Sequence, residues 1–349
     1  MSGTSMDGVD LAYCHFSYDD KRWTFDIQAA ETVAYEPEWI DKLNKLYSES
    51  ALSLAGTHSE YGRFLGKLVN AFVSKHQLKP GFVASHGHTI FHRPDKGFTF
   101  QLGDGAALNA VAGLPVIFDF RTQDVALGGQ GAPLVPAGDR LLFADYDACL
   151  NLGGIANISF EKNNERIAFD VCPANMVLNL LAGKTGKPYD DGGQIASGGK
   201  TDAHLLQELA SLPYYNTSAN APRSMGRETV EEQFLPLIAS SSLSIPDQLC
   251  TFCEHIAIKI SNALSSLKKG NGKVLITGGG AYNRYLVDRI KAHTQLAVVV
   301  PPDNIIQFKE ALIFAFLGVL RKRDEVNCLK SVTGASHDHS SGLMVGFAK

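Results

Sequence analysis

The stretch of sequence that decides the fold is ACLNLGGIANISF, residues 148–160. A mostly apolar run ends in two glycines and a second run begins at Ile155, which predicts a strand, a turn and another strand. The amino terminus, MSGTSMDGVDLAYCHF over residues 1–16, has a similar layout, because a glycine turn leads into an alternating strand from Val9. Both halves of the chain open in the same way, which indicates two related halves.

Strands and helices alternate through the rest of the chain. A second strand is predicted at residues 23–35, and short apolar strands are predicted at residues 82–84, 116–118, 167–170 and 274–277. Helices are predicted within 38–77, at 174–183, 201–210 and 227–268, from about 283, and at 308–323. This pattern predicts an α/β chain, and 349 residues suit two domains. We expect the first domain to hold residues 1–126 with 327–349 and the second to hold 127–326, since a glycine-rich break at 128–133 marks the crossing.

Composition and charge exclude several classes of protein. Hydrophobic residues make up 45% of the chain and charged residues 19%, so it can bury a substantial core. A net charge of −4 without a basic cluster argues against nucleic acid as a partner. No apolar run approaches the ~20 residues of a membrane-spanning helix, and the polar amino terminus predicts no signal peptide. We therefore expect a cytoplasmic protein. Its six scattered cysteines predict no disulfide framework, and Cys250 and Cys253 are expected in the core of a helix.

Three glycine turns are the candidates for chemistry. The first, residues 2–10, combines glycines, hydroxyl groups and carboxylates, which suit a phosphate and its magnesium ion. The second spans residues 151–157, where paired glycines let the backbone come close to a ligand. The third, residues 277–283, follows a strand and precedes a helix, so that helix N–H groups point toward an anion or a nucleotide base. Taken singly, the first two turns are more simply explained as hairpin turns.

The third turn also approaches the dinucleotide-binding pattern GxGxxG, through Gly278, Gly280 and Asn283, with Asp303 ending the next strand. Too few residues follow Asp303 to complete a dinucleotide-binding sheet. The chain contains no Walker A motif and no set of protein-kinase motifs. Three phosphate-type turns over two similar halves are instead typical of the actin-like fold, whose paired domains hold a nucleotide in the cleft between them.

The chain resembles the 1,6-anhydro-N-acetylmuramic acid kinases, a family of actin-like (ribonuclease H-like) α/β sugar kinases with two domains and an inter-domain nucleotide cleft. The resemblance runs through nearly the whole chain, and its motifs come in the right order. The matching segments are residues 1–10, 85–89, 119–121, 124–126, 128–134, 151–157, 169–170, 173–175, 277–281, 283, 310–311 and 314–315.

The resemblance implies an activity that couples two events. The family hydrolyses the internal 1,6-anhydro bridge of the sugar and phosphorylates the released O6 with ATP. The product is N-acetylmuramic acid 6-phosphate, formed during recycling of the bacterial cell wall. The implied cofactors are ATP and Mg²⁺, the implied partner is the sugar substrate, and a homodimer is implied as well.

The resemblance also implies the residues of the site. Asp170 matches the family's catalytic base, which activates water against the anomeric carbon; a positioned base contributes roughly 10²–10⁴ in rate. Asp7 is the expected protein neighbour of Mg²⁺, either directly or through a water molecule. The expected ATP-binding residues are Gly3, Thr4, Ser5, Met6, Asp7, Gly8, Val9, Asp10, Gly153, Gly154, Asn157, Gly278, Gly279, Gly280 and Asn283. The expected sugar-binding residues are Ser85, His86, Thr89, Arg121, Asn175 and Glu310.

Simpler roles remain open for several of these residues. Asp170 could cap the helix that follows it, Arg121 could form a structural ion pair, and Glu310 could complement the start of its helix. His86, His88 and His92 have a spacing that fits no strong metal template, so we predict no transition-metal site.

The chain departs from the family pattern in two places. The family usually reads Asp-Thr-Gly-Pro-x-Asn where this chain has Asp170-Val171-Cys172-Pro173-Ala174-Asn175, which we expect to alter phosphate contacts beside the base. Relatives also carry a short apolar strand ahead of the Met-Ser-Gly-Thr motif. We expect that strand to be shortened here or to begin upstream.

Two rival functions remain at this point. One is a sugar kinase of the same fold that phosphorylates a free hydroxyl without opening a bridge. The other is a nucleotide switch without enzymatic activity, which would not need Arg121, Asp170 and Glu310 together.

Overall fold

The computed structural model describes residues 1–2, 6–216, 223–265, 267 and 272–347. The chain forms two compact units: Met1–Leu142 with Phe308–Lys349 (unit 1), and Phe143–Gln307 (unit 2). Both ends of the chain belong to unit 1, in line with the expected layout. The bounds differ from the expected 1–126 with 327–349 and 127–326, because residues 127–142 and 308–326 belong to unit 1. Gly138 packs directly against Ile313, and Lys309 Nζ lies 2.7 Å from Asp139 Oδ1, which fixes these segments together.

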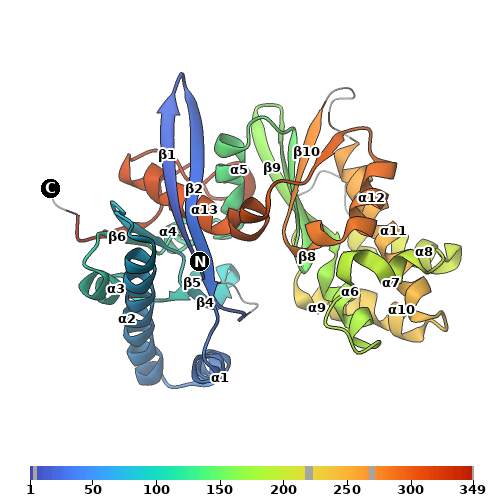
Figure 1. Cartoon of the computed structure of the whole chain (residues 1–349), viewed down its shortest axis with the longest axis horizontal. Helices are drawn as coiled ribbons and strands as arrows, with labels where there is room; N and C mark the ends of the chain where they lie inside the picture. Colours follow the sequence, from blue (N-terminus) through green and yellow to red (C-terminus); the bar gives the residue numbers. More distant parts are fainter. Residues whose placement is uncertain (3–5, 217–222, 266, 268–271, 348–349) are drawn as a thin grey trace. The chain divides into compact units, whose positions relative to one another are not determined.

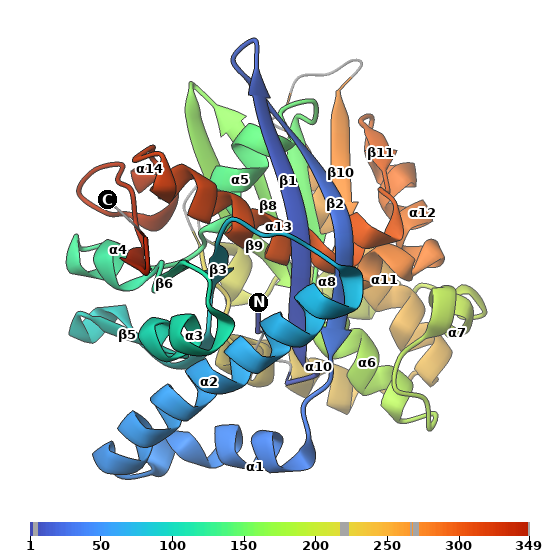
Figure 2. The same cartoon turned by 60° about the vertical axis from the view of Figure 1, so that its left-hand side comes forward.

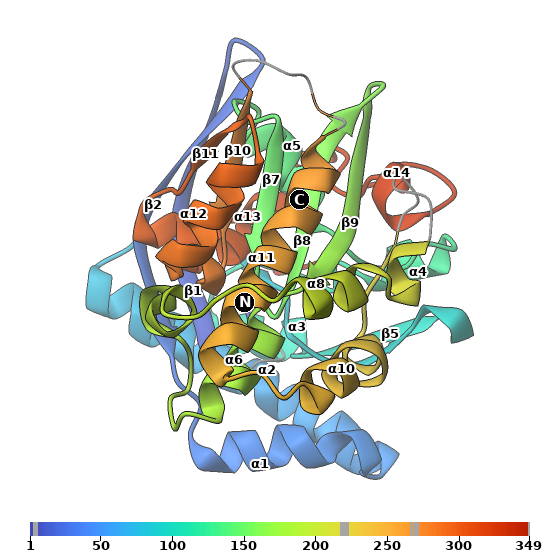
Figure 3. The same ribbon diagram turned by 90° about the vertical axis from the view of Figure 1, so that its right-hand side faces the viewer.

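Unit 2 is built on one five-stranded sheet. Its strand order is β11-β10-β7-β8-β9. Strand β10 runs parallel to both β7 and β11, and β8 runs antiparallel to both of its neighbours, β7 and β9. A five-stranded mixed sheet in which the second strand along the chain, here β8, is antiparallel to the others is the sheet of one domain of a ribonuclease H-like fold. Figure 3 shows α11 and α12 across one face of the sheet. The elements are β7 Ala148–Leu152, β8 Ile155–Lys162, β9 Glu165–Pro173, α6 Asn175–Gly183, η3 Asp191–Gly193, α7 Gln194–Ser197, α8 Ala203–Ala210, η4 Pro213–Asn216, α9 Arg227–Thr229, η5 Val230–Phe234, α10 Leu235–Ser240, α11 Ile245–Leu264, β10 Lys273–Thr277, η6 Gly279–Tyr282, α12 Arg284–His293 and β11 Ala297–Val299.

The core of unit 2 surrounds β7. Ala148, Leu150 and Leu152 of this strand are fully buried, as are Val274 and Ile276 of the neighbouring β10. A central strand with a parallel neighbour is covered on both faces of the sheet, so the side chains on both of its faces are apolar. Helices α6, α11 and α12 supply the facing apolar side chains.

The prediction of a single helix over residues 227–268 is wrong. This region holds a π-turn at Val230–Phe234, a short helix α10 and then the long helix α11. Pro236 lies in the first turn of α10, where its missing N–H removes a helical hydrogen bond from any continuous helix. Ser244 starts α11 afresh, because its hydroxyl accepts a hydrogen bond from the N–H of Asp247.

The described residues of unit 1 form three separate sheets. The long β1–β2 hairpin stands beside α2 (Figures 1 and 2), β12-β6-β3 form a second sheet, and β4–β5 form a third. Among the described residues of the whole chain, no helix has both the length and the apolar character needed to cross a membrane. The elements are β1 Val9–Asp19, β2 Arg22–Val33, α1 Pro37–Lys45, η1 Leu46–Ser48, α2 Ala51–His76, β3 Val83–Ser85, β4 His88–Arg93, η2 Pro94–Lys96, β5 Phe98–Leu102, α3 Gly105–Ala112, β6 Val116–Phe118, α4 Thr122–Ala126, α5 Val135–Leu142, α13 Asp303–Lys322, α14 Lys330–Thr333 and β12 Leu343–Val345, with α13 beginning in unit 2.

Local chemistry explains the main elements of unit 1. Asp20 and Lys21 both have positive φ and so form the tight turn between β1 and β2. Ser50 caps α2 by accepting a hydrogen bond from the N–H of Ser53, and Gln77 ends it in a left-handed conformation. The core of the unit is a buried apolar cluster that includes Tyr61, Leu65, Leu102, Leu108 and Val116.

Candidate active site

The second glycine turn joins β7 to β8 and lies beside the start of α6. The Gly154 carbonyl oxygen accepts a hydrogen bond from the N–H of Ala174 at 2.9 Å, and that of Gly153 accepts one from Asn175 at 3.1 Å. The Asn175 side chain donates from Nδ2 to the Leu152 carbonyl oxygen at 2.9 Å. These three bonds lock the turn against the helix, so a predicted sugar-binding residue and two predicted ATP-binding residues lie together.

The third glycine turn meets the same edge of the sheet, because β10 runs parallel to β7 and their carboxyl ends coincide. A Cβ on Gly280 would lie 2.6 Å from Leu152 Cβ, and one on Gly278 would lie 2.4 Å from Asn151 Oδ1. Gly278 also has a φ of +80°, which side chains rarely tolerate. The protein therefore needs these two glycines for its own packing.

Other glycines of these turns have no such constraint. A Cβ on Gly154 would meet nothing nearer than 3.8 Å, and one on Gly279 nothing nearer than 3.6 Å. Packing within the protein does not require glycine at either position. The absence of a side chain there leaves room for a ligand to reach the backbone.

Two asparagines complete the predicted set in unit 2. Asn157 lies directly opposite Asp170 in the β8–β9 ladder, beside a β-bulge, so both side chains lie on one face of the sheet. Asn283 caps α12, since its Oδ1 accepts a hydrogen bond from the N–H of Leu286 at 2.9 Å. That bond gives Asn283 a structural task in addition to the nucleotide role predicted for it.

Asp170 lies on β9, and the segment 223–225, which precedes α9, holds it in place. Its carboxylate Oδ2 accepts a hydrogen bond from the N–H of Met225 at 2.8 Å. Its backbone N–H donates to the Arg223 carbonyl oxygen at 3.0 Å, and its carbonyl oxygen accepts from the Tyr214 hydroxyl at 2.7 Å. The Met225 N–H thus directs the carboxylate, while Arg223 and Tyr214 fix the backbone of Asp170.

The electrostatics around Asp170 favour a proton acceptor. Partial burial raises the pKa of the Asp170 carboxyl, while the Met225 N–H, the Arg223 guanidinium and the Ser224 hydroxyl act against that rise. A raised pKa strengthens a carboxylate as a base. The alternative role as a helix cap is not observed, because the residue before α6 is Ala174 and no side chain caps this helix.

Sequence reasoning missed the segment that holds Asp170. Arg223 stacks its guanidinium over the rings of Phe169 and Tyr214, at 5.0 and 5.4 Å from their centroids, and its Nε donates to the Asp170 carbonyl oxygen. The sequence pattern that could have indicated this contact is an arginine in the short stretch Arg223–Gly226, which contains serine and glycine and precedes a helix. That pattern is too common to identify the contact.

Val171 and Cys172, which stand where the family usually has Thr and Gly, are part of the hydrophobic core of unit 2. Both side chains are fully buried among the apolar residues of unit 2. Burial raises the pKa of the Cys172 thiol to about 12, so it stays protonated. Cys250 and Cys253 are free and buried in α11, as the sequence predicted.

The first glycine turn lies in unit 1, and the predicted Gly3, Thr4 and Ser5 fall outside the described residues. Met1 pairs with Asp10 through two backbone bonds, Met1 N–H to Asp10 O at 2.7 Å and Asp10 N–H to Met1 O at 2.8 Å. Within this turn Met6 has a φ of 56°, and Asp7 is exposed.

Gly8 and its neighbours are fixed by β2. A Cβ on Gly8 would lie 2.4 Å from the Val33 carbonyl oxygen, so Gly8 lets two backbone segments approach each other. Val9 is buried, and the Asp10 carboxylate accepts a hydrogen bond from the Thr32 hydroxyl at 2.6 Å. Burial raises the pKa of Asp10.

A buried chain of polar groups ties the amino terminus to the core of unit 1. The Ser2 hydroxyl lies 3.0 Å from His88 Nδ1 and also bonds to the Tyr35 hydroxyl, which in turn bonds to Tyr61. Burial lowers the pKa of His88, which keeps this imidazole neutral. His88 is therefore a structural partner of the first glycine turn.

Arg121 is held by neutral acceptors. Its Nε donates to His86 Nε2 at 2.9 Å and its Nη1 donates to the Gly131 carbonyl oxygen at 2.6 Å, with the Phe314 ring 5.9 Å from the guanidinium. Burial, together with the Arg121 charge, holds the pKa of His86 well below its usual range. These contacts orient the guanidinium without neutralising its charge, as an anion-binding arginine requires.

The other predicted sugar-binding residues of unit 1 come from nearby elements. Ser85 is buried at the end of β3, and Thr89 on β4 accepts a hydrogen bond from Gln101 Nε2 at 3.4 Å. Glu310 is an exposed residue of α13, and its carboxylate favours the charged form of Arg121. Of the predicted sugar-binding residues in unit 1, the structure brings His86 and Glu310 next to Arg121.

In the described part of the chain, His86, His88 and His92 do not form a group that could bind a metal ion. His86 and His88 have the partners given above, and His92 Nδ1 lies 3.2 Å from the Thr99 hydroxyl. Within the part of the chain that the structure describes, one trio of side chains is close enough to share an ion: Asp124, Cys328 and His339. Asp124 already accepts hydrogen bonds from the Thr333 hydroxyl and the Gly131 N–H, which gives it a structural role.

Known proteins match this chain along its length. The family model for anhydro-N-acetylmuramic acid kinase matches residues 1–346. Curated proteins named anhydro-N-acetylmuramic acid kinase from Xanthomonas oryzae and Idiomarina loihiensis are each 34% identical to it, covering 96% and 99% of this chain and 93% and 97% of their own. One from Shewanella loihica is 34% identical, covering 97% of this chain and 95% of its own.

Among solved structures, an activator of 2-hydroxyisocaproyl-CoA dehydratase from Clostridium difficile aligns over 65% of this chain and 88% of its own, at 15% identity and a TM-score of 0.37. This likeness is too weak to bear on function. The family match and the curated relatives cover nearly the whole chain at more than 30% identity, and the chain therefore belongs to the anhydro-N-acetylmuramic acid kinase family.

Proposed function

We propose that this enzyme opens the 1,6-anhydro bridge of 1,6-anhydro-N-acetylmuramic acid and transfers the γ-phosphoryl group of ATP to O6, with Asp170 as the general base. The products are N-acetylmuramic acid 6-phosphate and ADP. The observation that carries this assignment is the position of Asp170, directed by Met225 and Arg223 and given a raised pKa by burial.

The proposed reaction couples opening of the bridge to transfer of the phosphoryl group. A water molecule attacks the anomeric carbon and passes a proton to the Asp170 carboxylate. The bond between that carbon and the bridging oxygen breaks, and its electron pair stays on the oxygen, which becomes O6. O6 then forms a bond to the γ-phosphorus as the bond from phosphorus to the leaving oxygen of ADP breaks.

The glycine turns support the ATP end of the proposal. Gly154 and Gly279 keep space open beside the backbone at one edge of the unit 2 sheet, next to Asn175 and Asn157. An oriented backbone at such an edge suits phosphate groups and a nucleotide. The first turn, residues 3–10, is proposed to contribute further phosphate contacts.

Arg121 supports the sugar end of the proposal. The substrate carries a lactyl carboxylate, and a guanidinium fork matches a carboxylate in shape and charge. His86 and Gly131 hold that fork in one orientation. We place Glu310, Ser85, Thr89 and the side chain of Asn175 at the sugar hydroxyl and amide groups.

Asp7 and Asp10 fit a magnesium ion that arrives with the nucleotide. Mg²⁺ is usually held by one or two carboxylates together with phosphate oxygens, and the exposed Asp7 with the partly buried Asp10 offers that donor set. The bound ion would supply charge neutralisation at the phosphates. We also propose a homodimer that works in the cytoplasm, which light scattering and cell fractionation would test.

Asp170→Asn tests the base directly. The change is nearly isosteric and removes the proton acceptor, so turnover should fall by at least ~10²–10³ while ATP binding persists. Asp191→Asn is the matched control, because Asp191 is an exposed carboxylate of the same unit and should keep normal turnover. Near-native turnover of Asp170→Asn would remove this residue from the mechanism.

Isotope and substrate tests separate the proposal from its rivals. In ¹⁸O-labelled water the label should appear on the anomeric hydroxyl and not on the phosphate; label on the phosphate would indicate plain ATP hydrolysis. Assays with ATP and the anhydro-sugar, N-acetylmuramic acid or glucose should show phosphorylation of the anhydro-sugar. Activity on the free sugars alone would favour an ordinary sugar kinase, and no activity at all would favour a nucleotide switch.

A further inference from the structure

Unit 1 contains a buried cluster of three side chains, each of a type that binds metal ions. Asp124 lies on α4, while Cys328 and His339 lie in the carboxyl-terminal segment, on either side of α14. One ligand atom of each, a carboxylate oxygen, a thiol sulfur and a ring nitrogen, lies within 4.8 Å of the other two. None of the three residues is more than 6% exposed. They are also separate from the residues expected to bind ATP or the sugar.

The backbone places Cys328 and His339 side by side. They face each other in an isolated antiparallel bridge, in which the N–H of each donates to the carbonyl oxygen of the other, at 3.0 and 3.1 Å. Directly opposite residues of an antiparallel pair carry their side chains on the same face. The bridge therefore brings the thiol and the imidazole together.

Asn327 holds this bridge in place. Its side chain donates from Nδ2 to the carbonyl oxygens of Leu317 and Ser341, at 3.0 and 2.9 Å, and its Oδ1 accepts from the N–H of Ser341 at 2.7 Å. These bonds are buried and lie on both sides of the bridge. Two of the three candidate ligands are thus positioned by the fold before any ion binds.

His339 has a free ring nitrogen that faces a carboxylate. Its Nδ1 lies 3.2 Å from the carbonyl oxygen of His337, which can only accept, so Nδ1 carries the proton and Nε2 has a lone pair. Nε2 is buried without a hydrogen-bond partner among the described residues, 3.6 Å from Asp124 Oδ1. Metal-binding histidines commonly donate their other ring N–H to a backbone carbonyl. Two acceptors that face each other in a buried place are best satisfied by a cation between them.

The Asp124 carboxylate is oriented and still has room to bind an ion. Its Oδ1 accepts a hydrogen bond from the Thr333 hydroxyl and its Oδ2 accepts one from the Gly131 N–H, both at 2.7 Å. A carboxylate has about four lone-pair sites, so each oxygen keeps one free. Hydrogen bonds of this kind hold the carboxylate ligands of metal sites in position.

Charge and donor type favour zinc. Burial raises the pKa of the Cys328 thiol to about 12, so without a metal the thiol keeps its proton. A bound metal ion replaces that proton, and the resulting thiolate and the Asp124 carboxylate together balance a charge of +2. Sulfur, nitrogen and oxygen ligands at tetrahedral angles suit Zn²⁺ and lie about 3.3–3.8 Å apart, given bonds of about 2.0–2.3 Å. The distance from His339 to Asp124 already has this value, and the thiol needs to move by at most about 1 Å.

We propose that Asp124, Cys328 and His339 bind one Zn²⁺ ion, with a water molecule as the fourth ligand. On binding, the bond from sulfur to zinc replaces the bond from sulfur to hydrogen, and the proton passes to solvent. The ion joins the carboxyl-terminal segment to α4, so its role is structural. The site is distinct from His86, His88 and His92, whose spacing predicted no transition-metal site.

Metal binding is tested on the full chain, stripped of metal and free of nucleotide. Titration with Zn²⁺ in a calorimeter should show one ion per chain with a Kd of about 1 µM or tighter. Zn²⁺ at 100 times its Kd should raise Tm by at least about 3 °C. Co²⁺ in place of Zn²⁺ should give the strong visible bands of a tetrahedral site and a charge-transfer band from a thiolate. Absence of stoichiometric binding would overturn the proposal and leave His339 and Asp124 as an ion pair.

Variants identify the ligands. His339→Gln should weaken Zn²⁺ binding at least about 100-fold, whereas the matched control His337→Gln, at an exposed histidine two residues away, should bind as the native chain does. Cys328→Ser should remove the charge-transfer band of the cobalt protein. Equal affinity of His339→Gln and the native chain would refute the site, and so would a band that persists in Cys328→Ser, because the ion would then be bound by another cysteine. The cobalt spectrum of the native chain decides the presence of a thiolate ligand even where a variant does not fold.

Discussion

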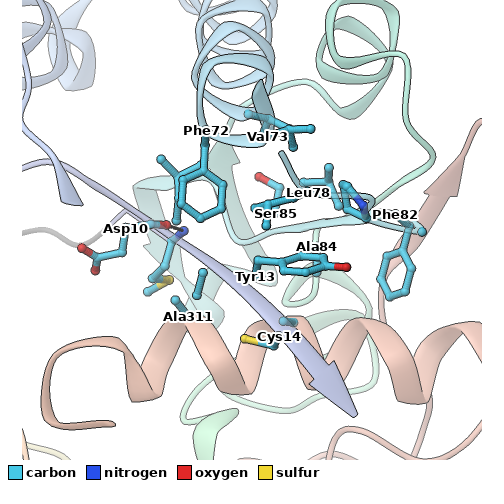
Figure 4. Close-up of a pocket in the computed structure, with 18 of the residues that line it drawn as sticks. Asp10, Tyr13, Cys14, Phe72, Val73, Leu78, Phe82, Ala84, Ser85 and Ala311 are labelled. Atoms are coloured by element: carbon cyan, nitrogen blue, oxygen red, sulfur yellow. Dashed lines mark hydrogen bonds between the residues drawn. The ribbon is translucent and has the colours of Figure 1, made fainter. Parts of the chain in front are cut away.

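The two units share a layout and differ at their centres. Unit 2 has a central strand, β7, in which every residue except the half-buried Asn151 is buried, with Leu150 at 0% exposure. In unit 1, β1 and β3 belong to different sheets, and both strands line a groove (Figure 4). The comparison teaches that the strand next to a glycine turn does two tasks: it closes the sheet, and it fixes the backbone from which the turn begins.

The difference extends to the chemistry of the turns. In unit 2 the turn after β7 is bonded to α6 and packed beside Gly278 and Gly280. In unit 1 the first turn is held by backbone bonds from Met1 to Asp10 and by the buried Ser2–His88 contact. In both units, contacts between segments distant in sequence hold the turn: with α6 and the third glycine turn in unit 2, and with β1 and His88 in unit 1.

The largest expected effect tests the central strand. Leu150→Ala removes a fully buried side chain from β7 and should lower the free energy of unfolding by ~2–5 kcal/mol. Val83→Ala, at the half-buried edge of the groove, should cost under about 1.5 kcal/mol. Denaturant unfolding of both variants gives the comparison. Equal losses would show that the two sheets are equally closed.

The glycines of unit 2 provide the next test. Gly280→Ala places a methyl group 2.6 Å from Leu152 Cβ, so it should lower Tm. Gly154→Ala meets no atom within 3.8 Å, so its Tm should not change, while its ATP affinity falls about tenfold. Thermal melts and calorimetry separate the two. Unchanged ATP affinity in Gly154→Ala would remove this turn from the nucleotide site.

Arg121→Lys tests the unit 1 contribution. Lysine keeps the charge but cannot reproduce a planar fork held by His86 and Gly131. The KM for the sugar should rise about tenfold, a change of about 1.4 kcal/mol, with a smaller change in kcat. Steady-state kinetics at saturating ATP measures both. A normal KM would leave Arg121 a structural residue.

The smallest expected effect is a displacement in pH. Because burial raises the pKa of Asp170, the acid limb of kcat/KM should lie above the ~3.9 of an ordinary aspartate. Activity is lost as the pH falls through that raised pKa, since the protonated carboxyl cannot accept the water proton. The residual rate of Asp170→Asn should lack this limb. A limb that persists in the variant would report another group.

Much of the architecture followed from the sequence. The apolar runs around Leu150, Ile117 and Ile276 predicted their strands, because short apolar runs bounded by glycine or polar residues favour buried strands. A set of short motifs in the right order, from residues 1–10 to 314–315, indicated the family, which the relatives confirm. These signals are local, and residues close in the chain carry them.

Only the tertiary structure decided which glycines the packing requires and which it leaves open. Gly278 and Gly154 look alike in sequence, but only Gly278 faces Asn151 at a distance that no Cβ tolerates. The contact of Asp170 with Met225, 55 residues away, was equally invisible, because one sequence carries no record of distant pairing. The groove beside β3 could be seen only once the strands were placed in space. Sequence patterns specify each strand by its own periodicity, whereas the neighbours of a strand depend on how the whole chain packs.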